Sequence, residues 1–167
     1  MAGDEWYKDV VFYQIWPRSF ADADGDGIGD LYGVYEKLSY IKSLGVGGIW
    51  FSPLYVSPNV DYGYDIADYR RISPDYGDEQ IFRRVLKRAH ELGLKVIMDL
   101  VINHTSIEHE WFQKGIDPKS PYHDYYIWRD PSPDDDASNN WQSMFGGPAW
   151  TYCEENGQYY LHLFSPG

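Results

Sequence analysis

Blocks of apolar residues alternate with polar segments through the first two thirds of this chain. Short runs rich in β-branched and aromatic residues predict strands over 10–16, 46–52 and 94–102. Between them, apolar residues recur every three or four positions, which predicts amphipathic helices over 31–44 and 78–92. The chain therefore begins as a regular alternation of strands and helices.

Each predicted helix ends at a glycine, Gly45 or Gly93, which leads directly into the next strand. Strands that alternate with helices predict parallel pairing with right-handed crossovers, as in a doubly wound sheet or an eight-stranded barrel. The loops after the strands are long and polar, whereas those after the helices are minimal. The carboxyl ends of the strands are therefore the expected working face.

From Thr105 onward this periodicity fails. Prolines punctuate a stretch that is dense in tryptophan, tyrosine, aspartate and asparagine, with one further strand predicted over 158–164. The pattern predicts two domains, residues 1–104 and a loop-rich inserted subdomain over 105–167. The acidic run at 134–136 is expected to be a solvated part of that insertion.

The predicted third strand delivers polar side chains at its end. Its apolar residues indicate a strand buried on both faces, and Asp99, Asn103 and His104 are expected to emerge together beyond it. A binding site is one interpretation. The alternative is a buried aspartate satisfied by backbone donors and a histidine that merely ends the strand.

The loop after the second strand carries Asp61, Tyr64 and Asp65. Such residues beside Pro58 and Gly63 are often turn formers rather than ligands. Their position after a strand, parallel to that of the polar residues after the next strand, favours a shared crevice at the carboxyl ends of the strands.

A loop near the amino terminus places carboxylates at alternate positions, with glycines between them, in the segment DADGDGIGD. Carboxylates held so close would repel one another without a hard cation, and calcium suits a site of several carboxylates and a carbonyl. The alternative is a solvated acidic turn, since Gly33 replaces the last acidic ligand of a complete EF-hand loop. The expected ligands are Asp22, Asp24, Asp26, the Ile28 carbonyl and Asp30.

Composition narrows the possible partners. With 26 acidic and 14 basic residues the net charge is −12, which argues against nucleic acid or an anionic membrane as a partner. Aromatic residues make up 18% of the chain, and such rings either pack or stack on sugar faces. Cys153 is the single cysteine and no apolar run reaches the roughly 18 residues of a membrane span, so a cytoplasmic protein is expected.

Four segments in order resemble the oligo-1,6-glucosidase and α-glucosidase group of the α-amylase superfamily, glycoside hydrolase family 13. They are FYQIWPRSFADADGDGIGDLYG, GIWFSPLYVSPNVDYGYDIADY, KVIMDLVINHTS and NNWQSMFGGPAW. The resemblance implies an α/β fold, namely the first three strands of a (β/α)8 TIM barrel with subdomain B inserted after strand 3. It implies short α-glucosides of the isomaltose or maltose type as substrates, a structural calcium ion and no organic cofactor.

The resemblance also implies roles for individual residues. Asp61 and Tyr64 match the pair that holds the terminal glucose, by hydrogen bonds and by stacking. Asp99 matches a residue that orders the site, and His104 one that reaches the glucose 6-hydroxyl. Phe145 resembles an aromatic residue that lines the next sugar's site, and the acidic loop matches the group's metal loop.

The chain departs from the family pattern in what it lacks. Retaining hydrolysis needs a nucleophile and an acid/base about 5 Å apart, and in this family both come from later strands, expected beyond Gly167. A complete barrel takes about 250 residues, so we expect a fragment that folds poorly alone and is inactive.

Related activities stay open: a trehalose-6-phosphate hydrolase or a sucrose isomerase of the same family. So do a non-enzymatic amylase-like protein and a stand-alone calcium-binding or carbohydrate-binding module.

Overall fold

The computed structural model describes residues 5–132 and 139–167; the acidic run at 134–136 lies outside the described residues. The chain forms two compact units, Met1–Val56 with Tyr69–Val101, and Ser57–Asp68 with Ile102–Gly167. This grouping places the loop after the second predicted strand with the insertion. The predicted domain division after residue 104 stays a prediction.

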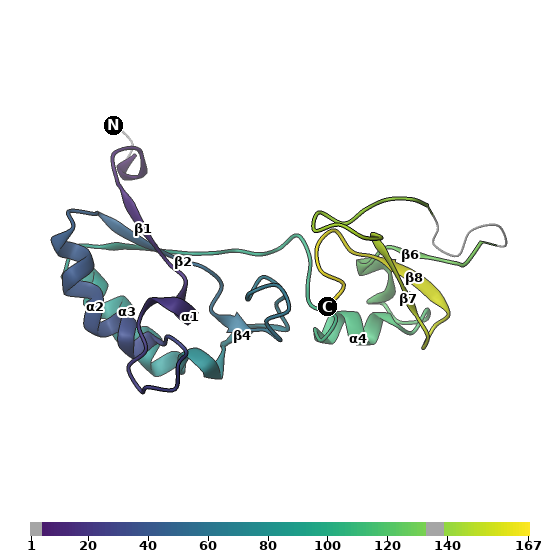
Figure 1. Cartoon of the computed structure of the whole chain (residues 1–167), viewed down its shortest axis with the longest axis horizontal. Helices are drawn as coiled ribbons and strands as arrows, with labels where there is room; N and C mark the ends of the chain where they lie inside the picture. The colour runs from purple at the N-terminus through teal and green to yellow at the C-terminus, as the bar shows by residue number, and fades with distance from the viewer. Residues whose placement is uncertain (1–4, 133–138) are drawn as a thin grey trace. The chain divides into compact units, whose positions relative to one another are not determined.

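The first unit contains a three-stranded parallel sheet (Figure 1). Its order is β1-β2-β5, with β1 at Phe12–Ile15, β2 at Gly48–Phe51 and β5 at Lys95–Met98. The register aligns Phe12 with Gly48 and Gly48 with Lys95. The predicted parallel pairing is confirmed.

Both predicted helices of this unit are confirmed, as α2 at Leu31–Ser43 and α3 at Glu79–Glu91. The carboxylate of Asp30 accepts a hydrogen bond from the Gly33 N–H at 2.7 Å, and that of Asp78 accepts one from the Ile81 N–H at 2.9 Å. These side chains satisfy backbone donors that the first turn of a helix leaves unpaired, so both helices begin where the sequence predicts.

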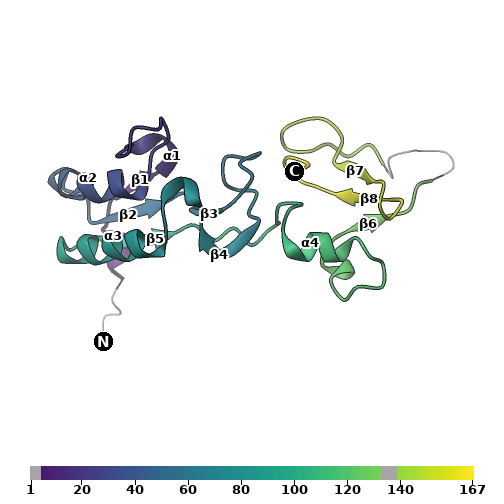
Figure 2. The same ribbon diagram turned by 90° about the horizontal axis from the view of Figure 1, so that it is seen from below.

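The core of the first unit lies between these two helices and the sheet, with both helices on the same face (Figure 2). The α2 and α3 side chains that face the strands are fully buried, and the stripes predicted from the sequence account for them. Core residues from both layers include Val34, Leu38, Ile41, Ile49, Phe51, Ile81 and Val85.

The predicted third strand is shorter and less buried than expected. β5 ends at Met98, its side chains alternate between exposed and half-buried, and Leu100 and Ile102 are 69% and 77% exposed. The prediction of burial on both faces is wrong because β5 is an edge strand and the helices cover one face of the sheet. Of the three polar residues expected together at the end of this strand, only Asp99 directly follows β5.

Shorter elements complete the first unit. The 3-10 turns η1 and η2 and helix α1 lie in connections, and strands β3 and β4 pair as a separate ribbon. Their bounds are Trp6–Lys8, Pro74–Tyr76, Pro17–Phe20, Tyr55–Val56 and Asp68–Ile72, respectively.

The amino-terminal end of α2 lies close to the backbone of the preceding loop. A Cβ at Gly33 would lie 2.2 Å from the Ala21 carbonyl oxygen, and the Asp30 N–H donates to that oxygen at 2.9 Å. A side chain at position 33 would not fit, so this glycine sets the distance between helix and loop.

The second unit has its own small core. An antiparallel sheet of order β6-β8-β7 packs with helix α4, and the ring of Phe112 lies 5.0 Å from Tyr160 and 5.1 Å from Tyr126. The strand predicted over 158–164 ends earlier. The elements are α4 at Glu110–Gly115, η3 at His123–Tyr125, β6 at Trp128–Arg129, β7 at Trp150–Cys153 and β8 at Gln158–Leu161.

Across residues 5–132 and 139–167, no helix is long and apolar enough to cross a membrane.

Candidate functional site

The loop over 57–65 adopts an unusual backbone conformation. Asn59 and Tyr62 have φ angles of 60° and 52°, and Gly63 has φ 100°. Residues other than glycine rarely adopt positive φ, and where they do, surrounding contacts must hold them there. Within this loop the Tyr64 N–H donates to the Asp61 carbonyl at 2.9 Å, closing a turn that carries both predicted sugar-binding residues.

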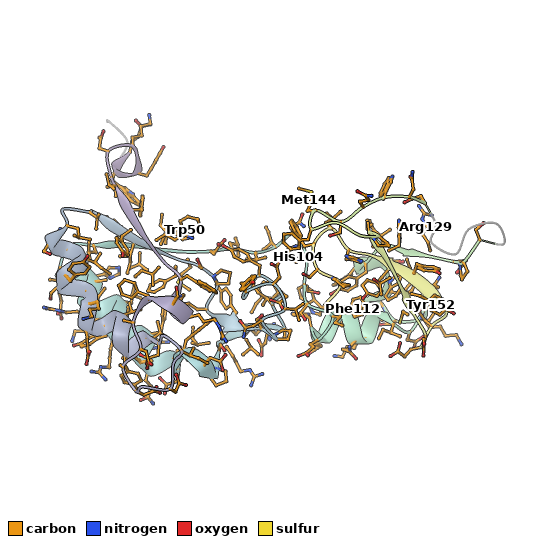
Figure 3. All side chains as sticks on the ribbon, viewed as in Figure 1. Trp50, His104, Phe112, Arg129, Met144 and Tyr152 are labelled. Atoms are coloured by element: carbon orange, nitrogen blue, oxygen red, sulfur yellow. The ribbon has the colours of Figure 1, made fainter. Side chains whose placement is uncertain are left out.

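His104 is tied to this loop by a hydrogen bond. Its Nε2 lies 3.1 Å from the carbonyl oxygen of Tyr64, and the side-chain amide nitrogen of Asn103 lies 3.1 Å from its Nδ1. His104 is labelled in Figure 3. An amide NH2 group only donates, so Nδ1 accepts and the ring proton is on Nε2, which donates to Tyr64. Asn103 therefore selects the tautomer, and the ring presents a donor on the side of the loop.

Asp61 lies in an environment that disfavours its ionised form. Partial burial raises the pKa of the Asp61 carboxyl, the nearby charge of Asp65 raises it further, and His104 acts in the opposite direction. Two carboxyls and an imidazole thus interact in one small region of the second unit. A carboxyl whose pKa is raised by burial and by a neighbouring charge is typical of a binding site.

Aromatic rings lie beside the imidazole. The ring of Phe164 is centred 5.0 Å from that of His104, and the ring of Phe145 is centred 5.8 Å from Phe164. Phe145 is 63% exposed, so its face is open to a ligand. Phe164 is not among the predicted site residues because position 164 ends the strand predicted over 158–164; the signal in the sequence is an aromatic residue at the end of a strand pattern.

Asp99 belongs to the other unit. It directly follows β5, its backbone N–H donates to the Phe51 carbonyl at 3.2 Å, and its charge adds to the effect of burial in raising the pKa of Tyr55. The structure therefore brings Asp61, Tyr64, His104 and Phe145 into one unit. The convergence of Asp99 with them stays a prediction.

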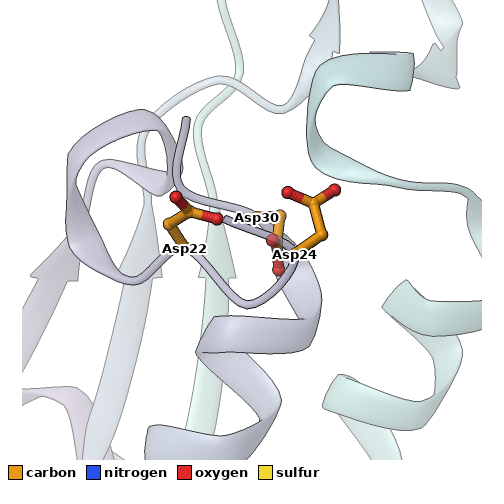
Figure 4. Close-up of side chains that lie close together, drawn as sticks. All are labelled: Asp22, Asp24 and Asp30. Atoms are coloured by element: carbon orange, nitrogen blue, oxygen red, sulfur yellow. The ribbon is translucent and has the colours of Figure 1, made fainter. Parts of the chain in front are cut away.

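The acidic loop brings three carboxylates together. Oxygens of Asp22, Asp24 and Asp30 all lie within 4.8 Å of one another (Figure 4), with Asp30 buried and the other two exposed. Asp26 is not part of this group; its carboxylate accepts from the Ile28 N–H at 2.7 Å. Three of the four predicted carboxylate ligands therefore converge.

Backbone donors already serve these carboxylates. Asp22 accepts from the N–H groups of Gly25 and Gly27 at 2.7 and 2.8 Å, and these bonds lower the pKa of Asp22. Asp30 accepts from Ala23 as well as from Gly33. The loop is thus preformed, with hard oxygen donors of the kind that calcium prefers.

Comparison with known proteins identifies the class. The family described as alpha amylase, catalytic domain, matches residues 14–167, so this chain belongs to that family. It is 56% identical over 162 residues to the oligo-1,6-glucosidase of Heyndrickxia coagulans, a match that covers 96% of this chain and 29% of that protein.

Solved structures of related enzymes also superpose closely on this chain. The Bacillus licheniformis trehalose-6-phosphate hydrolase superposes with a TM-score of 0.91 at 50% identity, and a variant of the trehalulose synthase MutB in complex with glucose superposes with 0.92 at 48%. Each match covers 96% of this chain and 29% of the relative. The chain therefore spans less than a third of its relatives.

The predicted fold class is confirmed: the parallel strands are the N-terminal portion of the barrel of these enzymes. The full-length relatives include glycoside hydrolases.

Proposed function

We propose that the whole protein is a retaining α-glucosidase that hydrolyses terminal α-1,6 or α-1,4 bonds of short oligosaccharides of the isomaltose or maltose type. This chain would supply part of its glucose subsite. The observation that carries the proposal is the hydrogen bond between His104 and the Tyr64 carbonyl, which joins the Asp61 loop to the imidazole and to the rings of Phe145 and Phe164.

Each side chain has a chemical role in this proposal. The Asp61 carboxylate accepts hydrogen bonds from sugar hydroxyls, and the Tyr64 ring stacks on the apolar face of the glucose. The Nε2–H of His104 donates to the 6-hydroxyl, which then competes with the Tyr64 carbonyl for this proton. Phe145 lines the next sugar, and Asp99 orders the site.

Cleavage itself needs residues that this chain does not supply in the proposal. Double displacement requires a carboxylate nucleophile and a carboxylic acid about 5 Å apart, which we place beyond Gly167. The 167-residue chain is therefore expected to show no turnover of 4-nitrophenyl α-glucoside, whereas a longer reading frame is expected to restore it. Turnover by the 167-residue chain that Asp99→Ala abolishes would refute this division of labour.

Two related activities are kept as alternatives because relatives carry them. A trehalose-6-phosphate hydrolase would release glucose 6-phosphate from trehalose 6-phosphate, and a sucrose isomerase would rearrange sucrose without net hydrolysis. Product analysis of the whole protein on the three substrate types separates these activities. Sugar binding with no turnover of any of them would instead favour a non-enzymatic module.

The proposal includes a structural calcium ion in the acidic loop. Asp22, Asp24 and Asp30 would hold it, with Asp26 and the Ile28 carbonyl as the further predicted ligands. Calcium would neutralise the repulsion between these carboxylates and fix the loop. A cytoplasmic location completes the proposal, because one cysteine forms no intramolecular disulfide and suits a reducing compartment.

A further inference from the structure

A buried carboxylate holds the 57–65 loop from within. Asp65 is 2% exposed, and its two oxygens have different partners: Oδ1 accepts from the Ser57 hydroxyl and Oδ2 accepts from the Val60 N–H, both at 2.8 Å. Carboxylates are rarely buried without such donors, because desolvation of the charge is costly. Asp65 therefore joins the first half of the loop to its end.

The same bonds reach the residues with unusual backbone angles. The Ser57 hydroxyl that donates to Asp65 also accepts from the Asn59 N–H at 2.9 Å, and the Asn59 side chain donates to the Ser57 carbonyl at 3.3 Å. Asn59 has a positive φ, a conformation that persists only where neighbouring contacts fix it. This network is centred on Asp65 and encloses the segment that carries Asp61 and Tyr64.

We propose that Asp65 is a positioning residue for the glucose subsite: its buried carboxylate fixes the 57–65 loop and thereby orients Asp61 and Tyr64 without itself contacting the sugar. The inference rests on the proposed function, since it assigns Asp65 a role in that site. Asp65 has a second effect through space, because its charge disfavours ionisation of Asp61 and raises the pKa of that carboxyl.

Two variants separate geometry from charge. In Asp65→Asn the side-chain carbonyl still accepts from Val60 and the amide can donate to the Ser57 hydroxyl, so the loop is kept while the charge is removed. In Asp65→Ala both bonds are lost. Glu154→Gln, at an exposed carboxylate of the same unit, controls for the change in net charge.

Glucose binding by the whole protein and its variants is measured by NMR titration across a pH range. Asp65→Ala is expected to weaken binding by about tenfold or more, the usual cost of breaking hydrogen bonds to a charged group. Asp65→Asn is expected to retain binding but to move its pH profile to lower pH, since the like charge beside Asp61 is gone. A purely structural role for Asp65 would not shift that profile.

Unchanged binding and an unchanged pH profile in the Asp65 variants would overturn the inference. If the wild-type protein binds no glucose, the proposed function fails for this chain, and the loop is then judged by the backbone resonances of Asn59, Val60 and Tyr62. Displaced resonances in Asp65→Ala but not in Asp65→Asn support positioning; unaltered resonances in both refute it. Where Asp65→Ala does not fold, Ser57→Ala, which removes one partner, gives the same comparison.

Discussion

The surroundings of the Asp61 carboxyl lower the stability of the folded state at neutral pH. Its pKa is raised chiefly by burial and then by Asp65, so the folded state disfavours the ionised form more than the unfolded chain does. For a carboxyl whose folded pKa lies above its unfolded pKa, the free energy of unfolding falls as the pH rises through that window.

We therefore expect Asp61→Asn to be more stable than the wild type at pH 7. The gain should vanish below about pH 3, where the carboxyl is protonated in both states. Urea unfolding at the two pH values measures this difference, and glucose titration should show weaker binding by the same variant. A loss of stability at neutral pH would contradict this account of the Asp61 environment.

His109 has the opposite dependence on pH. Burial lowers its pKa, with Asp68 and Glu110 acting against that effect, and its Nδ1 accepts from the Trp111 N–H at 3.1 Å where α4 begins. As the pH falls below the ordinary histidine pKa of about 6.5, the unfolded chain binds a proton first. Stability is therefore lost between that pH and the lowered folded pKa.

His109→Asn is expected to reduce this acid-induced loss, because asparagine also caps a helix but does not titrate. Thermal unfolding at pH 7 and pH 5 provides the measurement. His90→Asn, at an exposed histidine on α3, is the matched control. An equally large loss in His109→Asn would exclude His109 as its source.

At the scale of elements, the acidic loop and the first turn of α2 depend on one another. Asp30 both caps α2 and belongs to the carboxylate group, whereas Asp26 lies outside that group. Calcium is expected to raise the unfolding temperature, since a ligand at a hundred times its Kd adds about 2.7 kcal/mol.

Asp24→Asn should largely remove the calcium effect, and Asp26→Asn should weaken it less. Calorimetric melts with and without calcium, with magnesium as the comparison ion, test this. If the two substitutions reduce the calcium-induced rise in unfolding temperature equally, or if the wild type shows no such rise, the acidic loop is better described as a solvated turn.

Local signals explain which elements the sequence predicts well. Asp30 and Asp78 cap the amino-terminal ends of α2 and α3, and Gly45 and Gly93, both with positive φ, follow their carboxyl-terminal ends. The bounds of both helices therefore follow from neighbouring residues. The burial of β5 depends instead on which strands and helices lie beside it, information that its own residues do not carry.

The candidate site shows the same limit. The order of Asp61, Tyr64 and His104 along the chain predicts a shared region, and the His104 hydrogen bond to Tyr64 lies there. The positive φ of Asn59 and Tyr62 is not predictable, because neither residue requires it. Phe164 was missed for a related reason: its contact with His104 depends on where β8 ends.

At the scale of the whole molecule, the two units have separate cores. Phe112 is 6% exposed and packs against rings of α4's own unit, whereas Phe82 packs against Phe51 in the first unit. Truncating a buried phenylalanine typically costs about 3–5 kcal/mol. The separation of the cores predicts that each truncation acts mainly on its own unit.

Phe112→Ala is expected to lower amide hydrogen-exchange protection in β7 and β8 while α2 and α3 keep theirs. Phe82→Ala, at a half-buried phenylalanine of the first unit, should show the reverse pattern with a smaller loss. Uniform loss of protection in both variants would mean that the units unfold as one. The expectation that the chain folds poorly alone stays a prediction, and exposed apolar residues beyond β5 support it.

Gly33 has a mechanical consequence. Because no side chain lies between α2 and the Ala21 carbonyl, the backbone of the helix packs directly on the backbone of the acidic loop, and a movement of one is transmitted to the other. A cation clamping the loop would brace the helix axis, and through Leu38 and Ile41 it would stiffen strands that bear none of its ligands. The concentration of that cation in solution would then determine how often the hydrogen bonds of the sheet open.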